Sequence, residues 1–274
     1  MKIALDVMGG DHAPTANLDG AKLAIHSLPD IQRLYLVGDE QTIKAQLDGS
    51  LIDQKKIEIV HADQTVEMHE SPAKAIRRKK NSSISIATDL VKEGTCEALV
   101  SAGNTGAAVA AATIKLRNLP GVERAGIASP IPNEHGQCNI VDAGANPDAK
   151  PIHLLQYAIM GTVYSKHVLG KTSPRVGLMS VGTEDDKGTE LTREVFAMLK
   201  ESSLNFIGNI EGHDLFEKEI DVVVCDGFTG NVMLKSCEAT ASIMTKWIKQ
   251  EIIKSPLRKI GAALIKPAFK AAMS

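Results

Sequence analysis

The fold is decided by the stretch Leu99-Val100-Ser101-Ala102-Gly103-Asn104-Thr105-Gly106, which the alanine-rich run 107–112 follows. A short apolar run ends at Ser101, two glycines flank Asn104 and Thr105, and alanine has a high helix propensity. This pattern predicts a strand, a tight turn and the start of a helix. Free backbone N–H groups and the positive end of a helix dipole suit a phosphate at such a turn. An ordinary connection is the alternative, and no Gly-Lys-Ser/Thr follows to make a Walker A loop.

The composition is typical of a soluble globular protein with a sizeable core. The 274 residues suffice for one large or two modest domains. Hydrophobic residues make up 43% and charged residues 23%, which are ordinary globular values. A net charge of -2 argues against a general nucleic-acid binder, and 3% aromatic residues argue against base-stacking platforms.

The cysteines and the N-terminus both indicate a cytoplasmic protein. The four cysteines, at positions 96, 138, 225 and 237, form no CxxC pair and have no histidine-rich neighbours. They are therefore expected to be reduced core thiols. The N-terminus reaches an acid at Asp6, which excludes a signal peptide. No apolar run approaches the length that spans a bilayer.

Predicted strands alternate with predicted helices along the whole chain. The strands are expected at 2–5, 34–37, 57–60, 99–101, 125–129, 139–141, 175–180, 205–207 and 222–225, with Pro130 and Pro132 ending the fifth. The helices are expected at 15–27, 40–47, 83–92, 107–112, 151–168 and 189–200, with others starting at Pro72 and near Asn231. This order predicts a parallel sheet with helices on both faces, which binds ligands outside the carboxyl ends of its strands.

Five predicted strand ends carry glycine together with Asn, Thr or Asp. They are 6–12, 101–106, 142–146, 182–188 and 226–231. Five such turns favour a shared polar crevice. Another loop holds His61, Asp63, Glu67, His69 and Glu70, but its spacing matches no standard metal site.

A basic run follows the predicted helix start at Ser71-Pro72. It contains Lys74, Arg77, Arg78, Lys79 and Lys80. Such a run is usually a solvated helix face. A docking surface for an anionic ligand or an acidic protein is the alternative.

Five segments resemble motifs of the bacterial phosphate acyltransferases of the PlsX family, in order and over essentially the whole chain. They are Asp6-Val7-Met8-Gly9-Gly10-Asp11-His12-Ala13-Pro14, Arg77-Arg78-Lys79-Lys80-Asn81-Ser82-Ser83, 101–106, Gly182-Thr183-Glu184-Asp185 and Asp226-Gly227-Phe228-Thr229-Gly230-Asn231. The resemblance implies an α/β/α sandwich with a mostly parallel sheet, similar to phosphotransacetylases and isocitrate/isopropylmalate dehydrogenases. It implies one catalytic domain over residues 1–274. Family members usually continue with a further segment, which is expected to be missing here.

The resemblance also implies a reaction and its partners. An acyl group passes reversibly from acyl carrier protein to inorganic phosphate, and the acyl phosphate supplies phospholipid synthesis. The implied partners are acyl carrier protein, phosphate, a second copy of the chain, an anionic membrane surface and the downstream glycerol-3-phosphate acyltransferase. Arg77, Arg78, Lys79 and Lys80 would dock the carrier protein. No cofactor, metal or nucleic acid is required, and the protein would sit peripherally on the inner face of the cell membrane.

This chemistry needs two anionic partners to be positioned and an oxyanion to be stabilised. Lys187 could neutralise phosphate or the oxyanion, and Asn231 could donate amide hydrogens. His12 could be a donor or a weak base, although a structural hydrogen bond is the alternative. The expected phosphate- and substrate-binding residues are Gly9, Gly10, Ser101, Gly103, Asn104, Thr105, Gly106, Asp142, Asn146, Thr183, Asp226 and Thr229. Cys225 lies mid-strand and is expected to be a buried structural thiol.

Two other functions stay open at this point. An NAD- and metal-dependent decarboxylating dehydrogenase shares the fold, but it needs clustered arginines that the turns do not hold. A non-catalytic membrane scaffold for acyl carrier protein would not need five polar strand ends.

The C-terminal region 245–274 is expected to be a projecting amphipathic helical region. Apolar residues recur at helical steps in Ile248, Ile252, Leu257, Ile260, Leu264 and Phe269, among seven basic residues and the single acid Glu251. Pro256 and Pro267 should break it into two or three helices. This pattern favours a helix in an anionic membrane interface through Leu257, Ile260 and Leu264, with packing in a homodimer as the alternative.

Overall fold

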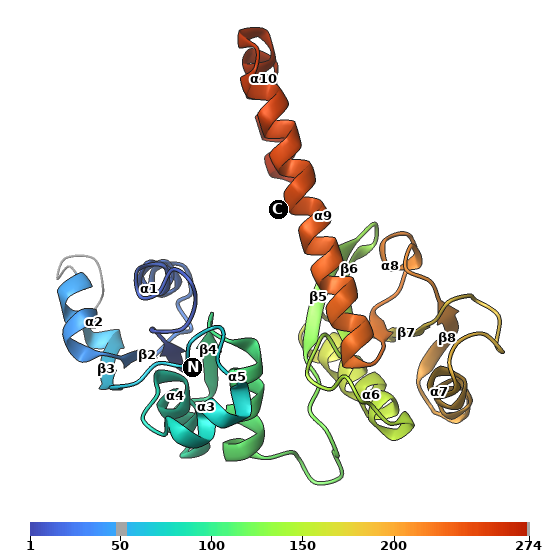
Figure 1. The fold of residues 1–274 in the computed structure, drawn as a ribbon, viewed down its shortest axis with the longest axis horizontal. Helices are drawn as coiled ribbons and strands as arrows, with labels where there is room; N and C mark the ends of the chain where they lie inside the picture. The colour runs from blue at the N-terminus through green and yellow to red at the C-terminus, as the bar shows by residue number, and fades with distance from the viewer. Residues whose placement is uncertain (48–53, 273–274) are drawn as a thin grey trace. The chain divides into compact units, whose positions relative to one another are not determined.

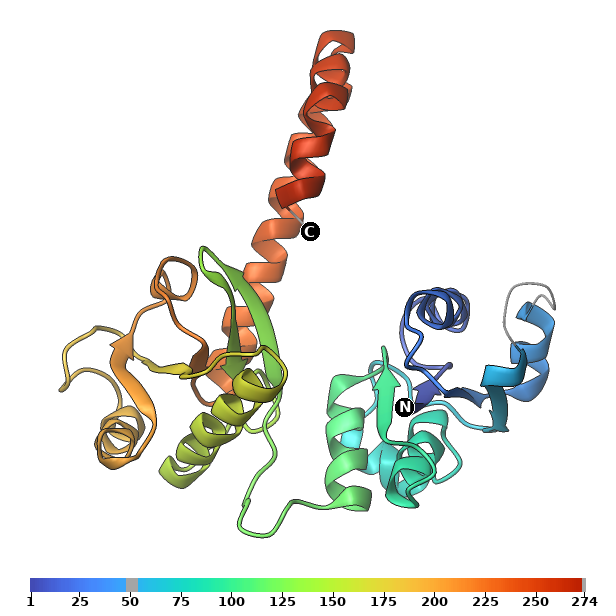
Figure 2. The same cartoon turned by 180° about the vertical axis from the view of Figure 1, so that it is seen from behind.

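The computed structural model describes residues 1–47 and 54–272, and the chain divides into two compact units, 1–125 and 126–274 (Figures 1 and 2). Each unit has its own sheet and its own core and is described by itself. Whether both act as the single catalytic domain expected from the sequence stays a prediction.

The sheet of the first unit has four strands in the order β3-β2-β1-β4. These are β1 (Lys2–Asp6), β2 (Arg33–Gly38), β3 (Ile57–His61) and β4 (Ala98–Ser101). Every pair is parallel, with Leu5 of β1 opposite Leu36 on one side and Val100 on the other. β1 is therefore central, and the polar loops after β1 and β4 leave the same edge of the sheet side by side.

Helices cover both faces of this sheet because its side chains alternate. Leu5, Leu34 and Leu36 pack against α1 (Thr15–Ser27) and α2 (Glu40–Gln46), while Ala4 and Tyr35 pack against α4 (Ser83–Lys92). The other helical segments are α3 (Pro72–Arg78), α5 (Thr105–Ala111), η1 (Gln54–Lys56) and the π-helical turn η2 (Ala112–Leu116). The buried face of α1 is formed by Leu18, Ala21 and Ile25.

The second unit holds a five-stranded sheet in the order β5-β6-β9-β7-β8. Its strands are β5 (Ala128–Asn133), β6 (Gly136–Val141), β7 (Arg175–Met179), β8 (Asn205–Ile210) and β9 (Val222–Val224). Only β5 is antiparallel to its neighbour. Val222 and Val224 face a core under α6 (Pro151–His167) and α7 (Glu190–Glu201). Val223 faces a second core that α8 (Asp214–Glu217) helps to build.

Two predicted strand ends in this unit are wrong. Pro130 and Pro132 lie inside β5 rather than ending it. Proline is tolerated there because β5 is the edge strand, where one row of N–H groups has no partner to reach. Likewise β8 continues through Gly208 to Ile210, with a register shift opposite it in β7 and a positive φ of 100° at Gly208.

Helix α6 buries one face in the core of the unit. Leu154, Ala158 and Thr162 are buried, but Ile159 and Val163 are 45% and 51% exposed. The buried face instead includes His153, Tyr157, Gly161 and Ser165. Gly161 lies directly on the sheet, because an added Cβ would be 2.6 Å from Val222 Cγ1. The glycine lets the helix approach closely and sets which face turns inward.

The C-terminal part of the unit is helical and largely exposed. α9 (Gly227–Ile253) starts four residues earlier than the predicted Asn231, and only Gly227 and Gly230 on it are buried. It extends away from its own sheet and is followed by α10 (Pro256–Ala272), which packs on it (Figure 1). The break before Pro256 is confirmed. Pro267 lies inside α10 without ending it, so the region forms two helices, the smaller of the two numbers predicted. No helix among the described residues is long and apolar enough to cross a membrane.

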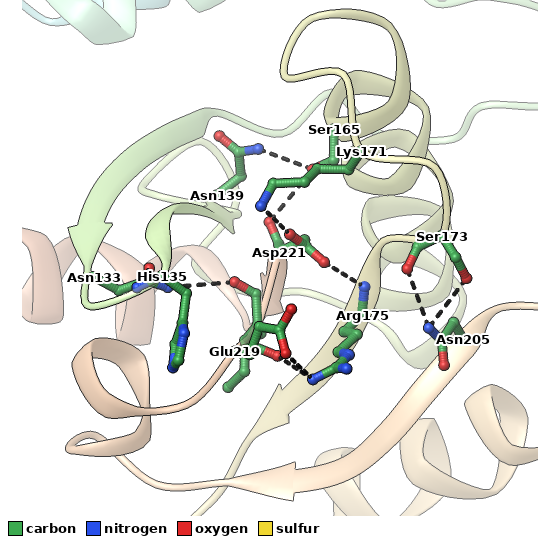
Figure 3. Close-up of polar contacts among 11 residues, drawn as sticks. Asn133, His135, Asn139, Ser165, Lys171, Ser173, Arg175, Asn205, Glu219 and Asp221 are labelled. Atoms are coloured by element: carbon green, nitrogen blue, oxygen red, sulfur yellow. Dashed lines mark hydrogen bonds and ion pairs between the residues drawn. The ribbon is translucent and has the colours of Figure 1, made fainter.

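A polar network ties the amino ends of β7 and β9 together (Figure 3). Asp221 Oδ2 accepts the Arg175 N–H at 2.8 Å, and Asp221 Oδ1 lies 3.0 Å from Lys171 Nζ. Asn139 donates its N–H to Asp221 O at 2.9 Å and its side-chain amide to Ser165 at 3.1 Å. This network braces the edge of the sheet opposite the predicted ligand-binding loops.

Candidate functional site

In the first unit, the loops after β1 and β4 touch through glycines. A Cβ added at Gly9 would lie 3.0 Å from the Gly103 backbone and 2.5 Å from Asp6 Oδ2. Gly10 has a φ of 105°, and a Cβ there would lie 2.7 Å from Ala102 O. Side chains at these positions would therefore push the two loops apart. The predicted residues Gly9, Gly10 and Gly103 are brought together, with Gly9 buried and Gly10 and Gly103 half-buried.

Asp6 is the buried centre of this loop pair. Its Oδ2 accepts the Ser101 hydroxyl at 2.7 Å, and Ser101 Oγ accepts the Gly103 N–H at 3.1 Å. Burial raises the pKa of Asp6, while hydrogen bonds from Ser83, Ser101 and the backbone of Met8 and Gly9 oppose that rise. Ser101 and the Gly103 N–H, both predicted to bind phosphate, thus hold the loop in shape.

Asn104 is fully engaged within the protein. Its Oδ1 caps α5 by accepting the Ala107 N–H at 3.0 Å. Its Nδ2 donates to Met68 O at 2.9 Å and to Glu70 O at 3.2 Å. The amide hydrogens of Asn104 therefore anchor the loop 67–70 in this structure, and its role at phosphate stays a prediction. Thr105 is exposed at the start of α5, and Gly106 packs on Pro72.

Asn17 is a residue of this site that the sequence did not single out. It lies on α1, and its Nδ2 donates at 2.8 Å to both Val7 O and Gly9 O. An asparagine on the first helix after a glycine-rich loop is the only signal that could have indicated it. His12, by contrast, is exposed on the same loop, and none of the described residues bonds to its ring.

In the second unit, three of the predicted loops leave the sheet from adjacent strands. β9 lies between β6 and β7, and all three are parallel. The loops 142–146, 180–188 and 226–231 therefore emerge at the same edge. This confirms that these strand ends neighbour one another within the unit.

Asp142 organises its own loop rather than facing a ligand. It is completely buried, and its Oδ1 accepts the N–H groups of Ile127, Gly144 and Ala145 at 2.9–3.0 Å. Oδ2 accepts the Asn146 N–H at 2.7 Å. The carboxylate of Asp142 thus accepts four backbone N–H groups and holds the loop in shape, and its role in substrate binding stays a prediction.

Asn146 is held by two residues that the sequence did not predict. Its Nδ2 donates to His153 Nδ1 at 3.1 Å and to Tyr157 Oη at 3.2 Å. His153 Nδ1 also accepts the Lys150 N–H at 3.0 Å. The amide hydrogens of Asn146 are thus used inside the unit. His153 and Tyr157 are four residues apart in the predicted helix 151–168, so the sequence does indicate that both lie on one face near its start.

Asp226 is the N-cap residue of α9. Its Oδ1 accepts the Thr229 N–H at 2.9 Å, and its Oδ2 accepts the Thr229 hydroxyl at 2.7 Å. Gly227 and Gly230 let the helix start lie on the loop after β6, since a Cβ at Gly230 would be 1.9 Å from Asp142 O. Asp226 and Thr229 therefore form the cap of α9, and their role in substrate binding stays a prediction.

Asn231 and Lys187 remain free to act on a ligand. Asn231 is exposed on the first turns of α9, and its side chain lies beside Gly144, which has a φ of 137°. Lys187 is exposed in the loop after β7, and no ion pair to it occurs among the described residues. The neighbouring Asp185 is paired with Lys200 at 3.1 Å. Thr183 is exposed on the same loop.

Two further predictions concern thiols and metals. Cys225 is buried, donates to Asp142 O at 3.6 Å, and has a pKa raised by burial, so the predicted structural thiol is confirmed. Among residues 1–47 and 54–272, no group of three or more His, Cys, Asp or Glu could hold a metal ion. His61 instead accepts the Glu40 N–H at 3.3 Å.

The fold is α/β and is similar to that of phosphotransacetylases. The phosphotransacetylase EutD of Staphylococcus aureus has a TM-score of 0.61 at 20% identity, over 88% of this chain and 82% of its own. A branched-chain phosphotransacylase of Enterococcus faecalis has a TM-score of 0.53 at 15% identity, over 85% of this chain and 83% of its own. These similarities show the fold alone. A putative 4-hydroxythreonine-4-phosphate dehydrogenase of Salmonella typhimurium has a TM-score of 0.51 at 14% identity, over 86% and 84%.

Sequence relatives are much more similar. The phosphate acyltransferase of Akkermansia muciniphila is 56% identical over 277 residues, covering 99% of this chain and 79% of that protein. The phosphate acyltransferase of Pelotomaculum thermopropionicum is 50% identical, and the match covers 98% of this chain and 78% of that protein. The family model described as "Fatty acid synthesis protein" matches residues 1–274. The chain belongs to this family, which confirms the resemblance seen in its motifs.

Proposed function

We propose that this protein is a phosphate acyltransferase that moves a fatty acyl group from acyl carrier protein to inorganic phosphate. The observation that carries the proposal is the 56% identity to a phosphate acyltransferase over 99% of the chain. The relatives reported above do not favour the dehydrogenase or the scaffold alternative. A phosphate oxygen attacks the thioester carbonyl, the carbon–sulfur bond breaks, and the carrier leaves as a thiolate. The products are acyl phosphate and free carrier protein.

The chemical contribution of the protein is positioning and charge. The loops around Gly9, Gly10 and Gly103 offer closely approaching backbone for phosphate. Lys187 supplies a positive charge and Asn231 supplies amide donors for phosphate or for the tetrahedral oxyanion. His12, exposed on the first of these loops, is a donor or weak base. The buried, protonated thiol of Cys225 is not a nucleophile in this scheme.

The carrier protein is expected to dock on the cations of α3 and the residues after it. Arg77 and Lys80 are exposed, and no ion pair involves them in the described parts of the chain. Lys79 is different, because its Nζ lies 2.6 Å from Glu70 Oε2 and donates to Thr65 O at 2.7 Å. We therefore assign docking to Arg77, Arg78 and Lys80, with Lys79 as a structural cation.

The C-terminal helices carry the proposed membrane and dimer contacts. Leu257, Ile260 and Leu264 are 77%, 60% and 77% exposed on α10. Glu251 is paired with Lys254 and Arg258, whereas Lys246, Lys249, Lys259 and Lys266 have no ion pair among the described residues. An apolar stripe beside basic residues fits a peripheral helix on an anionic inner membrane surface. A second copy of the chain and the glycerol-3-phosphate acyltransferase that consumes acyl phosphate are the further proposed partners.

The test is phosphate-dependent release of carrier thiol. The chain is mixed with acylated carrier protein, and free thiol is titrated with and without inorganic phosphate. The proposal expects thiol and acyl phosphate in equal amounts only when phosphate is present. A thermal shift with NAD and Mg²⁺, without thiol release, would favour the dehydrogenase instead.

A further inference from the structure

A cavity of about 280 Å³ lies along α3, at the point where the preceding loop enters the helix. It is lined by Glu70, Ser71, Lys74, Ala75, Arg78 and Lys79. The reaction as described above uses the strand ends, and of the residues that line this cavity only Arg78 has been given a role, in docking the carrier protein.

The charges in the cavity do not cancel. Glu70 is occupied by Lys79, and this contact holds the pKa of Glu70 below its ordinary value. Lys74 and Arg78 are exposed and have no ion pair among residues 1–47 and 54–272. They are four residues apart, so they lie on one face of the helix. The cavity therefore contains the positive charges of Lys74 and Arg78, and the charges of Glu70 and Lys79 cancel each other.

The residues at the entrance of α3, which line the cavity, contact the glycine-rich loop after β4. Asn104 donates to Glu70 O at 3.2 Å and to Met68 O at 2.9 Å. Gly106 lies against Pro72, since an added Cβ would be 2.6 Å from Pro72 Cγ. With a rise of 1.5 Å per residue, Arg78 lies about 9 Å along the helix from Pro72. The two cations thus keep a short, constant distance from the loop proposed to bind phosphate.

We propose that this cavity binds the phosphodiester of the pantetheine arm that carries the acyl thioester. The inference rests on the proposed function, because the donor is then a thioester at the end of a long, flexible pantetheine chain. Arginine matches two phosphate oxygens with its planar fork, and lysine adds a point charge. The Ser71 hydroxyl makes no helix-capping bond and can donate as well. Sites for drug-sized ligands have volumes of about 300–1,000 Å³, so this one suits a phosphate with its nearest atoms.

The test uses free 4′-phosphopantetheine and free pantetheine as competitors of the acylated carrier protein. The two probes differ only in the phosphate. Each inhibition constant is measured on the full chain at saturating inorganic phosphate. We expect 4′-phosphopantetheine to inhibit about tenfold or more better than pantetheine, as charge-assisted hydrogen bonds would give. In Lys74→Gln/Arg78→Gln the ratio should fall toward one. Lys92→Gln removes an exposed cation on α4 outside the cavity and should keep the ratio.

Several outcomes would overturn the inference. Equal inhibition by both probes in the wild-type protein, or the wild-type ratio in the double variant, would remove the phosphodiester from the cavity. A raised KM for inorganic phosphate in the double variant, with the inhibition ratio intact, would give the cavity to that substrate instead. These results leave the proposed function standing. Absence of phosphate-dependent thiol release would overturn the function and the inference together.

Discussion

The Ser101 hydroxyl donates a 2.7 Å hydrogen bond to Asp6 Oδ2, joining the ends of two neighbouring parallel strands that are 95 residues apart in sequence. Ser101 Oγ in turn accepts the Gly103 N–H. Because a Cβ at Gly9 would lie 2.5 Å from the same carboxylate oxygen, the contact also fixes the loop after β1. One buried carboxyl group therefore sets the shape of both glycine-rich loops of the first unit.

Replacing Asp6 by asparagine should change how stability depends on pH. Burial raises the pKa of Asp6 in the folded protein, so the folded state holds this proton more tightly than the unfolded chain. Stability contributed by Asp6 is therefore largest at low pH, and it falls as pH rises from the unfolded pKa through the folded pKa. The Asp6→Asn variant should gain free energy of unfolding relative to wild type between pH 3 and pH 7, as measured by urea unfolding.

Ser101→Ala provides the matched comparison, because it leaves the carboxylate but removes its donor. An unsatisfied buried group costs about 1–3 kcal/mol, so this variant should be destabilised by that amount at pH 7. A difference between Asp6→Asn and wild type that does not vary with pH would show that Asp6 does not titrate abnormally.

Lys187→Ala should strongly reduce turnover without unfolding the protein. Lys187 is exposed and lacks an ion pair among the described residues, so its charge is available to phosphate or to the oxyanion. Loss of one such group typically costs about 10²–10³-fold in rate. Steady-state kinetics of thiol release give the rate, and thermal unfolding reports the fold.

Lys200→Ala is the control for that experiment, since Lys200 lies on α7, where it pairs with Asp185 of the same loop and its ammonium lies over the Phe196 ring. It should retain nearly full activity. Wild-type turnover in Lys187→Ala would remove Lys187 from the mechanism.

Much of the architecture was predictable because strand and helix periods are local properties. The bounds of α1 and α4 agree with prediction, and the polar strand ends do lie beside one another within each sheet. The direction of a polar side chain is not local. Asp142 and Asn104 look like ligand-binding residues in sequence, yet their partners are backbone groups of the protein. The edge position that admits Pro130 and Pro132 in β5 also depends on the finished sheet.

Reversing the charge of Arg77 and Lys80 should weaken docking of the acidic carrier protein. Both are exposed and lie outside the cavity along α3, and neither has the internal partner that Lys79 has in Glu70. The Arg77→Glu/Lys80→Glu variant should raise KM for acylated carrier protein about tenfold at low salt. The difference should shrink as salt rises, because exposed charges are screened beyond about 10 Å at 0.1 M. An unchanged KM at every salt concentration would leave the run as a solvated helix face.

Replacing Leu257, Ile260 and Leu264 by glutamate should abolish binding to anionic vesicles. The three native side chains are more than half exposed, so they are available for apolar contact with the vesicle. Glutamate at these positions would remove that apolar contact and would be repelled by the anionic surface. The measurement is co-sedimentation with phosphatidylglycerol vesicles, alongside the elution volume. Leu23→Glu, at a leucine 69% exposed on α1, is the control and should sediment normally. Normal sedimentation of the triple variant together with a monomeric elution volume would assign the stripe to a dimer contact.

The most direct test of the account is the dependence of thiol release on inorganic phosphate. Acylated carrier protein is incubated with the chain while phosphate is varied, and free carrier thiol and acyl phosphate are both quantified. We expect a saturable rise in rate with phosphate and one acyl phosphate for each thiol released. Thiol release that is independent of phosphate, or none at any phosphate concentration, would contradict the assignment as a phosphate acyltransferase.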